Sequence, residues 1–291
     1  MKMSKGEKIF NIFNISLLGL LAFSCLYPFL YVLNLSLASA AQASKEGLRI
    51  FPSDINWASY EIVFANDAII TGFVNTIIRT VIGTILTLLA TCIAAYPLAR
   101  PEMPHRSMFA FIILFTMIFS GGMIPTYILI QKLGLINSMW SLIIPALITP
   151  FNVIIMKNFF QGIPESLAES AKIDGANDFI ILFKIYIPLS MPVIATVALW
   201  TAVGHWNAWF DALLYINDES KQVLQVLLQR IVIESSSQLL EMGVTNTSVT
   251  AFTPETVKAA TIIVTVLPIL IVYPALQRFF VKGVSLGGVK E

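Results

Sequence analysis

The sequence predicts an all-α integral membrane protein with six transmembrane helices, because its residues are strongly apolar and the apolar residues form long runs. Hydrophobic residues make up 57% of the 291 residues, whereas an ordinary globular domain contains about 45–50%. Several runs reach the length of about 20 residues that a helix needs to cross a bilayer. The expected spans are residues 12–37, 72–98, 108–130, 139–160, 188–216 and 261–281. We therefore expect residues 1–291 to form a single transmembrane domain.

The first span, residues 12–37, could instead be a secretory signal. Lys2, Lys5 and Lys8 precede it, and Ala38-Ser39-Ala40 resembles a cleavage site. Its apolar stretch is, however, about twice as long as the 7–15 residues of a signal peptide. We therefore expect an uncleaved membrane anchor.

The second span, residues 72–98, and the fifth, residues 188–216, each carry a charged residue, Arg79 and Asp211. Charges within a membrane are costly and by default indicate a water-filled cavity or an ion pair. From the rise per residue of a helix, Arg79 lies about 10 Å and Asp211 about 8 Å from the outer ends of these spans. The two residues could form a salt bridge, face a substrate or extend to the outer surface.

Aromatic and amide side chains surround Asp211 in the fifth span. Aromatic faces stack on the C–H face of a sugar ring, and amide or carboxylate groups bond its hydroxyls. The alternative is a belt of tryptophans at the membrane interface. The candidate residues for a substrate pathway are Arg79, Trp206, Asn207, Trp209 and Asp211.

Helix-breaking residues are concentrated in the third, fourth and sixth spans. They are Gly121, Gly122 and Pro125 in the third span, Pro145 and Pro150 in the fourth, and Pro268 and Pro274 in the sixth. A broken backbone at membrane depth is tolerated only where protein buries it or where it lines a water-filled cavity. Ordinary proline kinks are the alternative, and the paired glycines favour a bend beside a pathway.

Two segments outside the membrane are long enough to fold. Residues 41–71 include an aromatic stretch, residues 57–64, that could lie at the interface. Residues 217–257 contain an apolar run, residues 223–233, which favours a short helix followed by an exposed loop. Loops longer than about 12–15 residues are usually functional or disordered.

Residues 164–188 form a polar insert between the fourth and fifth spans. Charged residues make up only 12% of the chain, yet this insert carries Glu165, Glu169, Lys172, Asp174, Asp178 and Lys184. Gly175 divides it, and Pro164 and Pro188 bracket it. The pattern predicts a helix–turn–helix that lies outside the hydrocarbon and is free to bind a soluble partner.

The distribution of Lys and Arg orients the chain, because cytoplasmic loops carry an excess of both. With a cytoplasmic N-terminus, one side holds eleven such residues: Lys2, Lys5, Lys8, Arg100, Arg106, Lys157, Lys172, Lys184, Arg278, Lys282 and Lys290. The other side holds six: Lys45, Arg49, Lys132, Lys221, Arg230 and Lys258. Both termini and the polar insert are therefore expected to be cytoplasmic.

The sequence lacks the common motifs for metal, nucleotide and dithiol chemistry. HExxH, the Walker A loop and CxxC are all missing. The two histidines, His105 and His205, fall on opposite sides of the membrane and cannot share a metal. The net charge of +1 is too small to create a positive potential that would attract nucleic acid. A secondary transporter would carry more spans and inverted repeats, and an intramembrane hydrolase would need an acid–base pair.

The polar insert carries a recognisable motif. Glu169-Ser170-Ala171-Lys172-Ile173-Asp174-Gly175-Ala176 closely resembles the EAA motif of ABC-importer permease subunits, and Ser170 in place of the usual Ala is the one departure in its core. Residues 122–127, 204–207 and 277–283 extend the resemblance to the carbohydrate-uptake branch, the MalG-like second permease. Within it the chain looks closest to subunits for acidic or polymer-derived oligosaccharides, such as the alginate and lipoprotein-associated systems.

This resemblance implies a subunit that forms half of the pathway for an oligosaccharide such as alginate or other uronate oligomers. Its partners would be a second homologous permease, two ATPase subunits and an extracytoplasmic solute-binding protein, in the bacterial cytoplasmic membrane. The ATPases would bind ATP and Mg²⁺; this chain would bind no cofactor or metal and hydrolyse nothing. The family places the EAA helix in a groove of an ATPase subunit, and residues 234–254 against the binding protein. The implied coupling residues are Glu165, Glu169, Ala171, Asp174, Gly175 and Ala176.

Overall fold

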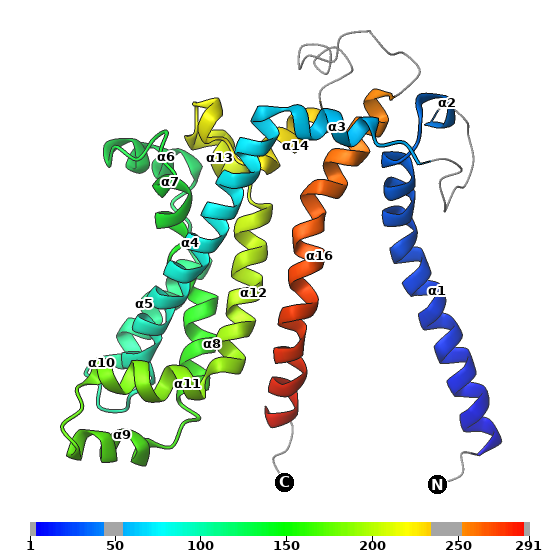
Figure 1. Cartoon of the computed structure of the whole chain (residues 1–291). Coiled ribbons are helices and arrows are strands. Elements are labelled where there is room, and N and C mark those ends of the chain that lie inside the picture. Colours follow the sequence, from blue (N-terminus) through cyan, green and yellow to red (C-terminus); the bar gives the residue numbers. More distant parts are fainter. Residues whose placement is uncertain (1–3, 44–54, 234–251, 288–291) are drawn as a thin grey trace. The chain divides into compact units, whose positions relative to one another are not determined.

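The computed structural model describes residues 4–43, 55–233 and 252–287, and all regular secondary structure in these residues is helical (Figure 1). They form two compact units, one within Met1–Ile69 and Leu228–Leu267 and the other within Ile70–Leu227 and Pro268–Glu291. Three helices are each long and apolar enough to cross a membrane: α1 (Lys5–Ser36), α4 (Asp67–Ala99) and the stretch Pro254–Val272 of α16 (Pro254–Gly287). Three bent helix pairs raise the number of candidate spans to as many as six.

The first unit is built on α1 and the start of α16. A capping box begins α1, in which Ser4 and Glu7 exchange side-chain and backbone hydrogen bonds. Most apolar side chains of α1 are exposed, as expected of a helix whose surroundings are lipid. The short helix α2 (Ala40–Ala43) follows it, and α3 (Ala58–Ala65) packs nearby. Hydrogen bonds from Tyr60 to Ser36 (2.7 Å) and from Ser59 to Thr256 (2.8 Å) hold α3 in the unit.

The second unit contains the bent pairs. Helices α5 (Arg106–Ile118) and α6 (Met123–Lys132) meet at 114°, and Gly122, with φ +90°, lies at the break. Helix α7 (Trp140–Ile143), continued by η1 (Ile144–Ala146), meets α8 (Pro150–Phe160) at 49°. The paired glycines of the third span therefore break its helix, as the sequence favoured, and the fourth span, for which an ordinary proline kink was the alternative, is also broken.

The fifth and sixth spans differ from the prediction. The fifth bends by 84° between Leu189 and Met191, so α12 (Met191–Asn207) is a separate helix from α11 (Ile187–Leu189). It ends at an extended Ala208, and α13 (Phe210–Tyr215) follows. The sixth is unbroken, because α16 continues through Pro268 and Pro274. A proline removes one backbone hydrogen bond, and membrane helices tolerate that loss.

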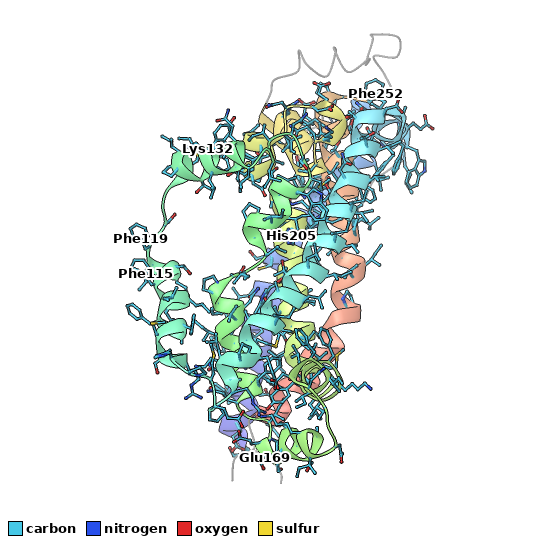
Figure 2. The ribbon with its side chains drawn as sticks, turned by 90° about the vertical axis from the view of Figure 1, so that its left-hand side faces the viewer. Phe115, Phe119, Lys132, Glu169, His205 and Phe252 are labelled. Carbon is cyan, nitrogen blue, oxygen red and sulfur yellow. The ribbon has the colours of Figure 1, made fainter. Side chains whose placement is uncertain are left out.

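The remaining elements lie at the two ends of the second unit. Helices α9 (Glu165–Ile173) and α10 (Asp178–Ile181), the π-helical turn η2 (Leu182–Tyr186) and α11 lie at one end of α4 and α12. Helices α6, α7 and α13 lie near the other end (Figure 1). Figure 2 shows Glu169 at one end, Lys132 near the other and His205 between them. The short η3 (Glu219–Lys221) and the predicted helix α14 (Leu224–Ile233) follow α13.

Helix α14 begins in close contact with α4. A Cβ atom at Gly72 would lie 2.8 Å from Leu227 Cδ1 and 3.2 Å from the Leu224 nitrogen. The hydroxyl of Thr76 accepts the Leu224 N–H at 2.9 Å. A glycine at position 72 is therefore what allows the two helices to approach each other.

Candidate functional site

The polar insert folds into the predicted helix–turn–helix, α9 followed by α10, and its turn has the geometry of a Schellman motif. The Gly175 N–H donates to the Lys172 carbonyl at 3.0 Å and the Ala176 N–H to the Ala171 carbonyl at 2.9 Å. Gly175 has a φ of +83°, a region that glycine enters without the Cβ clash of other residues. A residue that the sequence analysis did not select, Asn177, caps α10 by accepting the Ile180 N–H at 2.9 Å.

Helix α9 has one buried face and one exposed face. Ala168 is fully buried and Ala171 is partly buried, one turn apart, and both pack on a core formed by α4, α8, α10 and α12. Glu165, Glu169 and Ile173 follow at intervals of four residues and are exposed, Ile173 to 87%. The alanines allow α9 to lie close to the core, while its acidic and apolar face is exposed.

Ionic and aromatic contacts join this segment to the end of α4. Glu102, just after α4, pairs with Lys172 of α9 at 2.9 Å and with Arg100 at 3.3 Å. The Lys172 and then the Arg100 hydrogen bonds hold the pKa of Glu102 below its usual range, so this carboxylate stays charged until the pH falls through that lowered value. The guanidinium of Arg100 also donates to the Tyr186 hydroxyl of η2 at 3.3 Å. The segment and α4 are thus linked by several side chains at once.

A second site lies in the same unit, around a cavity of about 580 Å³. Arg79 of α4 is only 2% exposed and pairs with Asp211, whose side chain is 32% exposed. The other terminal nitrogen of Arg79 donates to the Ala208 carbonyl at 2.9 Å. The ion pair that the charges of the second and fifth spans permitted is therefore formed, and both of its members line the cavity.

The remaining cavity wall is polar and aromatic. The Trp200 Nε1–H donates to the Asn152 Oδ1 at 2.8 Å, and the Asn152 amide donates to the Thr201 hydroxyl at 3.4 Å. The rings of Phe151 and Trp200 lie 5.7 Å apart. Thr149, at the break before α8, and Gly204 and His205 of α12 complete this part of the wall. Such a wall offers hydrogen-bonding groups and aromatic faces, the two contacts that a sugar requires.

Only two of the five candidate pathway residues, Arg79 and Asp211, line this cavity. Trp206 packs edge-on against Phe73 at 5.9 Å and lines a separate apolar cavity of about 480 Å³. Trp209 packs on the apolar core beside α13, and Asn207 is exposed at the end of α12. The cavity wall also contains Asn152, Trp200 and Thr201, which the sequence pattern did not indicate, although each is a polar or amphipathic residue in an apolar run.

The second unit therefore combines broken helices around a polar cavity with an amphipathic helix–turn–helix at one end. The described residues hold no group of three or more His, Cys, Asp or Glu side chains that could bind a metal. Broken helices around a polar cavity are features of a membrane transport subunit.

Residues 106–286 match the family described as the inner membrane component of binding-protein-dependent transport systems, and the chain belongs to this family. It is 42% identical to the polygalacturonan/rhamnogalacturonan transport system permease protein YtcP of Bacillus subtilis, over 98% of this chain and 99% of that one. It is 43% identical to protein LplC of the same organism, over 99% and 97% of the two chains.

A solved structure has the same fold. It belongs to a bacterial ABC transporter involved in the import of the acidic polysaccharide alginate, and it matches with a TM-score of 0.89 and 35% identity over 96% of this chain and 99% of that one. The chain is thus a permease subunit of an ABC importer, a non-catalytic component of the bacterial inner membrane.

Proposed function

We propose that the chain forms half of the translocation pathway for an acidic oligosaccharide. The observation that carries this proposal is a buried arginine in the wall of a cavity that also offers aromatic and hydrogen-bonding groups. A cavity of about 580 Å³ falls within the range of about 300–1,000 Å³ typical of small-molecule sites. A charged residue within a membrane span is costly, and a neutral sugar would gain little from Arg79.

The similar proteins support the same substrate class. Polygalacturonan, in the name of one relative, is a polymer of a uronic acid, and the similar solved transporter imports the acidic polysaccharide alginate. Both polymers carry a carboxylate on each uronate unit, and a guanidinium can bind a carboxylate through two parallel hydrogen bonds. A uronate oligosaccharide is therefore the substrate that best fits Arg79.

The proposed topology has six spans, with each bent pair counted as one, and both termini in the cytoplasm. The excess of Lys and Arg on the side of the polar insert supports this orientation. The polar insert and α6, α7 and α13 lie near opposite ends of the second unit, as this orientation requires. The sugar would then enter at the end of the second unit that contains α13 and leave at the end that contains α9.

The proposed coupling surface is the exposed part of α9 and the turn that follows. Glu165, Glu169 and Asp174 would face basic groups of an ATPase subunit, and Gly175 would set the angle between the two short helices. Ala171 and Ala176 would hold the segment on the core, so that movement of the ATPase is passed on to α4 through Glu102 and Lys172.

The proposed complex contains a second homologous permease, two ATPase subunits that bind ATP and Mg²⁺, and an extracytoplasmic solute-binding protein. Family membership supports this set, because the family is defined by dependence on a binding protein. The segment that we expect to contact the binding protein, residues 234–254, lies almost wholly outside the described residues.

The proposal is tested by reconstituting the whole complex with its binding protein in vesicles. Trisaccharides of galacturonate and of mannuronate should stimulate ATP hydrolysis and be taken up, whereas the carboxyl-reduced trisaccharides should do so weakly. Stimulation by the neutral forms alone would refute the acidic substrate. Failure of any sugar to stimulate hydrolysis would refute the assignment to oligosaccharides.

A further inference from the structure

Arg79 has an incomplete set of hydrogen bonds. One terminal nitrogen donates to Asp211 and the other to the Ala208 carbonyl. The Nε–H is buried and has no hydrogen-bond partner in the part of the chain that the structure describes. Arginine binds a carboxylate most strongly when two of its guanidinium nitrogens donate parallel hydrogen bonds to the two carboxylate oxygens. Nε and the terminal nitrogen beside it form one such pair of donors. The contact with Asp211 uses only the terminal nitrogen of that pair.

Asp211 cannot complete the contact while it keeps its present position. Its Oδ2 accepts from Arg79, but its Oδ1 accepts the N–H of Ala212 at 2.9 Å. Ala212 is fully buried in an apolar core, and this core holds α13 in place. The backbone of Asp211 is therefore fixed at a distance that gives a single ionic contact rather than a double one.

The two members of the pair differ in their access to the cavity. Arg79 is 2% exposed and Asp211 32%, although both line the cavity. His205 packs against α4 one turn beyond Arg79, where a Cβ at Gly83 would lie 2.7 Å from its ring. Arg79 is therefore enclosed, and a carboxylate that arrives through the cavity meets Asp211 before it can reach the arginine.

We propose that Asp211 competes with the substrate carboxylate for Arg79, and that this competition lets an acidic sugar bind and then leave. This inference rests on the proposed function. An arriving uronate replaces the single contact of Asp211 with a double one to Nε and a terminal nitrogen, and the Asp211 side chain turns into the cavity. When the sugar moves on, Asp211 returns and neutralises Arg79, so the arginine does not retain the substrate.

The physical requirement behind this assignment is that a transport site must bind strongly enough to admit its cargo and weakly enough to release it. A buried, unopposed arginine would hold a carboxylate too tightly. A competing carboxylate lowers the affinity for acidic sugars much more than the affinity for neutral sugars. Asp211 is thus a specificity-determining residue whose loss is expected to slow transport by making binding tighter.

The test uses the reconstituted complex with Asp211→Asn, which removes the competing charge and keeps the shape. Hydrogen bonds to charged groups contribute enough for about a tenfold effect. The dissociation of labelled trigalacturonate from the purified complex should slow by about tenfold, and its maximal uptake rate should fall. Dissociation of the carboxyl-reduced trisaccharide should slow by much less than that of trigalacturonate. Asp218→Asn is the matched control, because Asp218 pairs with Lys221 at 3.6 Å and does not line the cavity.

A second variant covers the case in which Asp211→Asn does not assemble because Arg79 is left unpaired. Arg79→Gln with Asp211→Asn removes both charges and should transport acidic and carboxyl-reduced trisaccharides at equal rates. Unchanged dissociation and uptake in an assembled Asp211→Asn complex would overturn the inference, as would a retained preference for acidic sugar in the double variant. If the wild-type complex transports only the neutral sugar, it is the proposed function that fails.

Discussion

Replacing Gly175 with Val should uncouple the permease from its ATPase while the protein still folds. Gly175 has a φ of +83°, and no atom lies within 4 Å of the place where a Cβ would stand. The cost of the substitution is therefore backbone strain and not a steric clash. A β-branched residue in this region costs about 2 kcal/mol, which is small beside a folding stability of about 5–15 kcal/mol.

The strain falls on the turn between α9 and α10, which can relieve it by giving up the bonds from Gly175 and Ala176 to the end of α9. A penalty of about 2 kcal/mol on the docking conformation weakens association with the ATPase about 30-fold. The assay is co-purification of the ATPase together with sugar-stimulated ATP hydrolysis, at equal membrane levels of the permease. Asparagine tolerates a positive φ better than valine, so Gly175→Asn should retain most of the coupling.

The structure provides a matched control at the opposite end of the same unit. Gly134 has a φ of +67° and also has open space where a Cβ would stand. Gly134→Val should impose similar strain without weakening the ATPase interaction. Glu169→Lys, which leaves the turn unchanged and reverses an exposed charge, should also abolish stimulated hydrolysis. Normal stimulated ATP hydrolysis by both the Gly175→Val and the Glu169→Lys complexes, or equal uncoupling by Gly134→Val, would contradict a coupling role for the turn at Gly175.

Three further predictions follow from other contacts. Reversing either charge of the Glu102–Lys172 pair should reduce stimulated ATP hydrolysis. Glu102→Lys combined with Lys172→Glu should restore part of the lost hydrolysis. A double variant without any restored hydrolysis would contradict a direct role for the pair. Shortening residues 234–254 by about ten residues should weaken stimulation by the binding protein more than basal hydrolysis, whereas equal loss would indicate misfolding. Trp200→Phe, which removes the hydrogen bond to Asn152, should slow sugar uptake at a normal expression level. Trp206→Ala should lower assembly of the complex, because truncating a buried Trp costs about 3–5 kcal/mol. Poor assembly of Trp200→Phe together with slow uptake by a well-assembled Trp206→Ala complex would contradict both assignments.

The features that the sequence predicted well are those set by neighbouring residues. The turn at Gly175 depends on one glycine and on bonds between residues a few positions apart. The break at Gly122 is local in the same way. The bend before α12 also has a local signal, because Pro192 lies in the first turn of that helix. It was missed because the surrounding apolar run suggested one continuous span.

The contacts between helices could not be predicted in the same way. Asn152 and Trp200 are 48 positions apart and meet only because α8 and α12 pack together. Arg79 and Asp211 are 132 positions apart, and the sequence suggested their pairing only because both charges lie at similar depth in the membrane. Depth restricts the possible partners of a charge, but an uncharged amide in an apolar run has no comparable restriction.

Helical periodicity explains why Trp206 and the polar cavity lie on different faces of α12. Adjacent residues of a helix point in different directions, and residues three or four apart share a face. On α12, Leu199, Ala202, Val203 and Trp206 line the apolar cavity, while Trp200, Thr201, Gly204 and His205 line the polar one. Trp206 lies beside His205 in the sequence and yet belongs to the other face. Arg79 of α4 lines the polar cavity, so the α12 residues that share this cavity with Arg79 are Trp200, Thr201, Gly204 and His205, and Trp206 faces the apolar cavity on the other side.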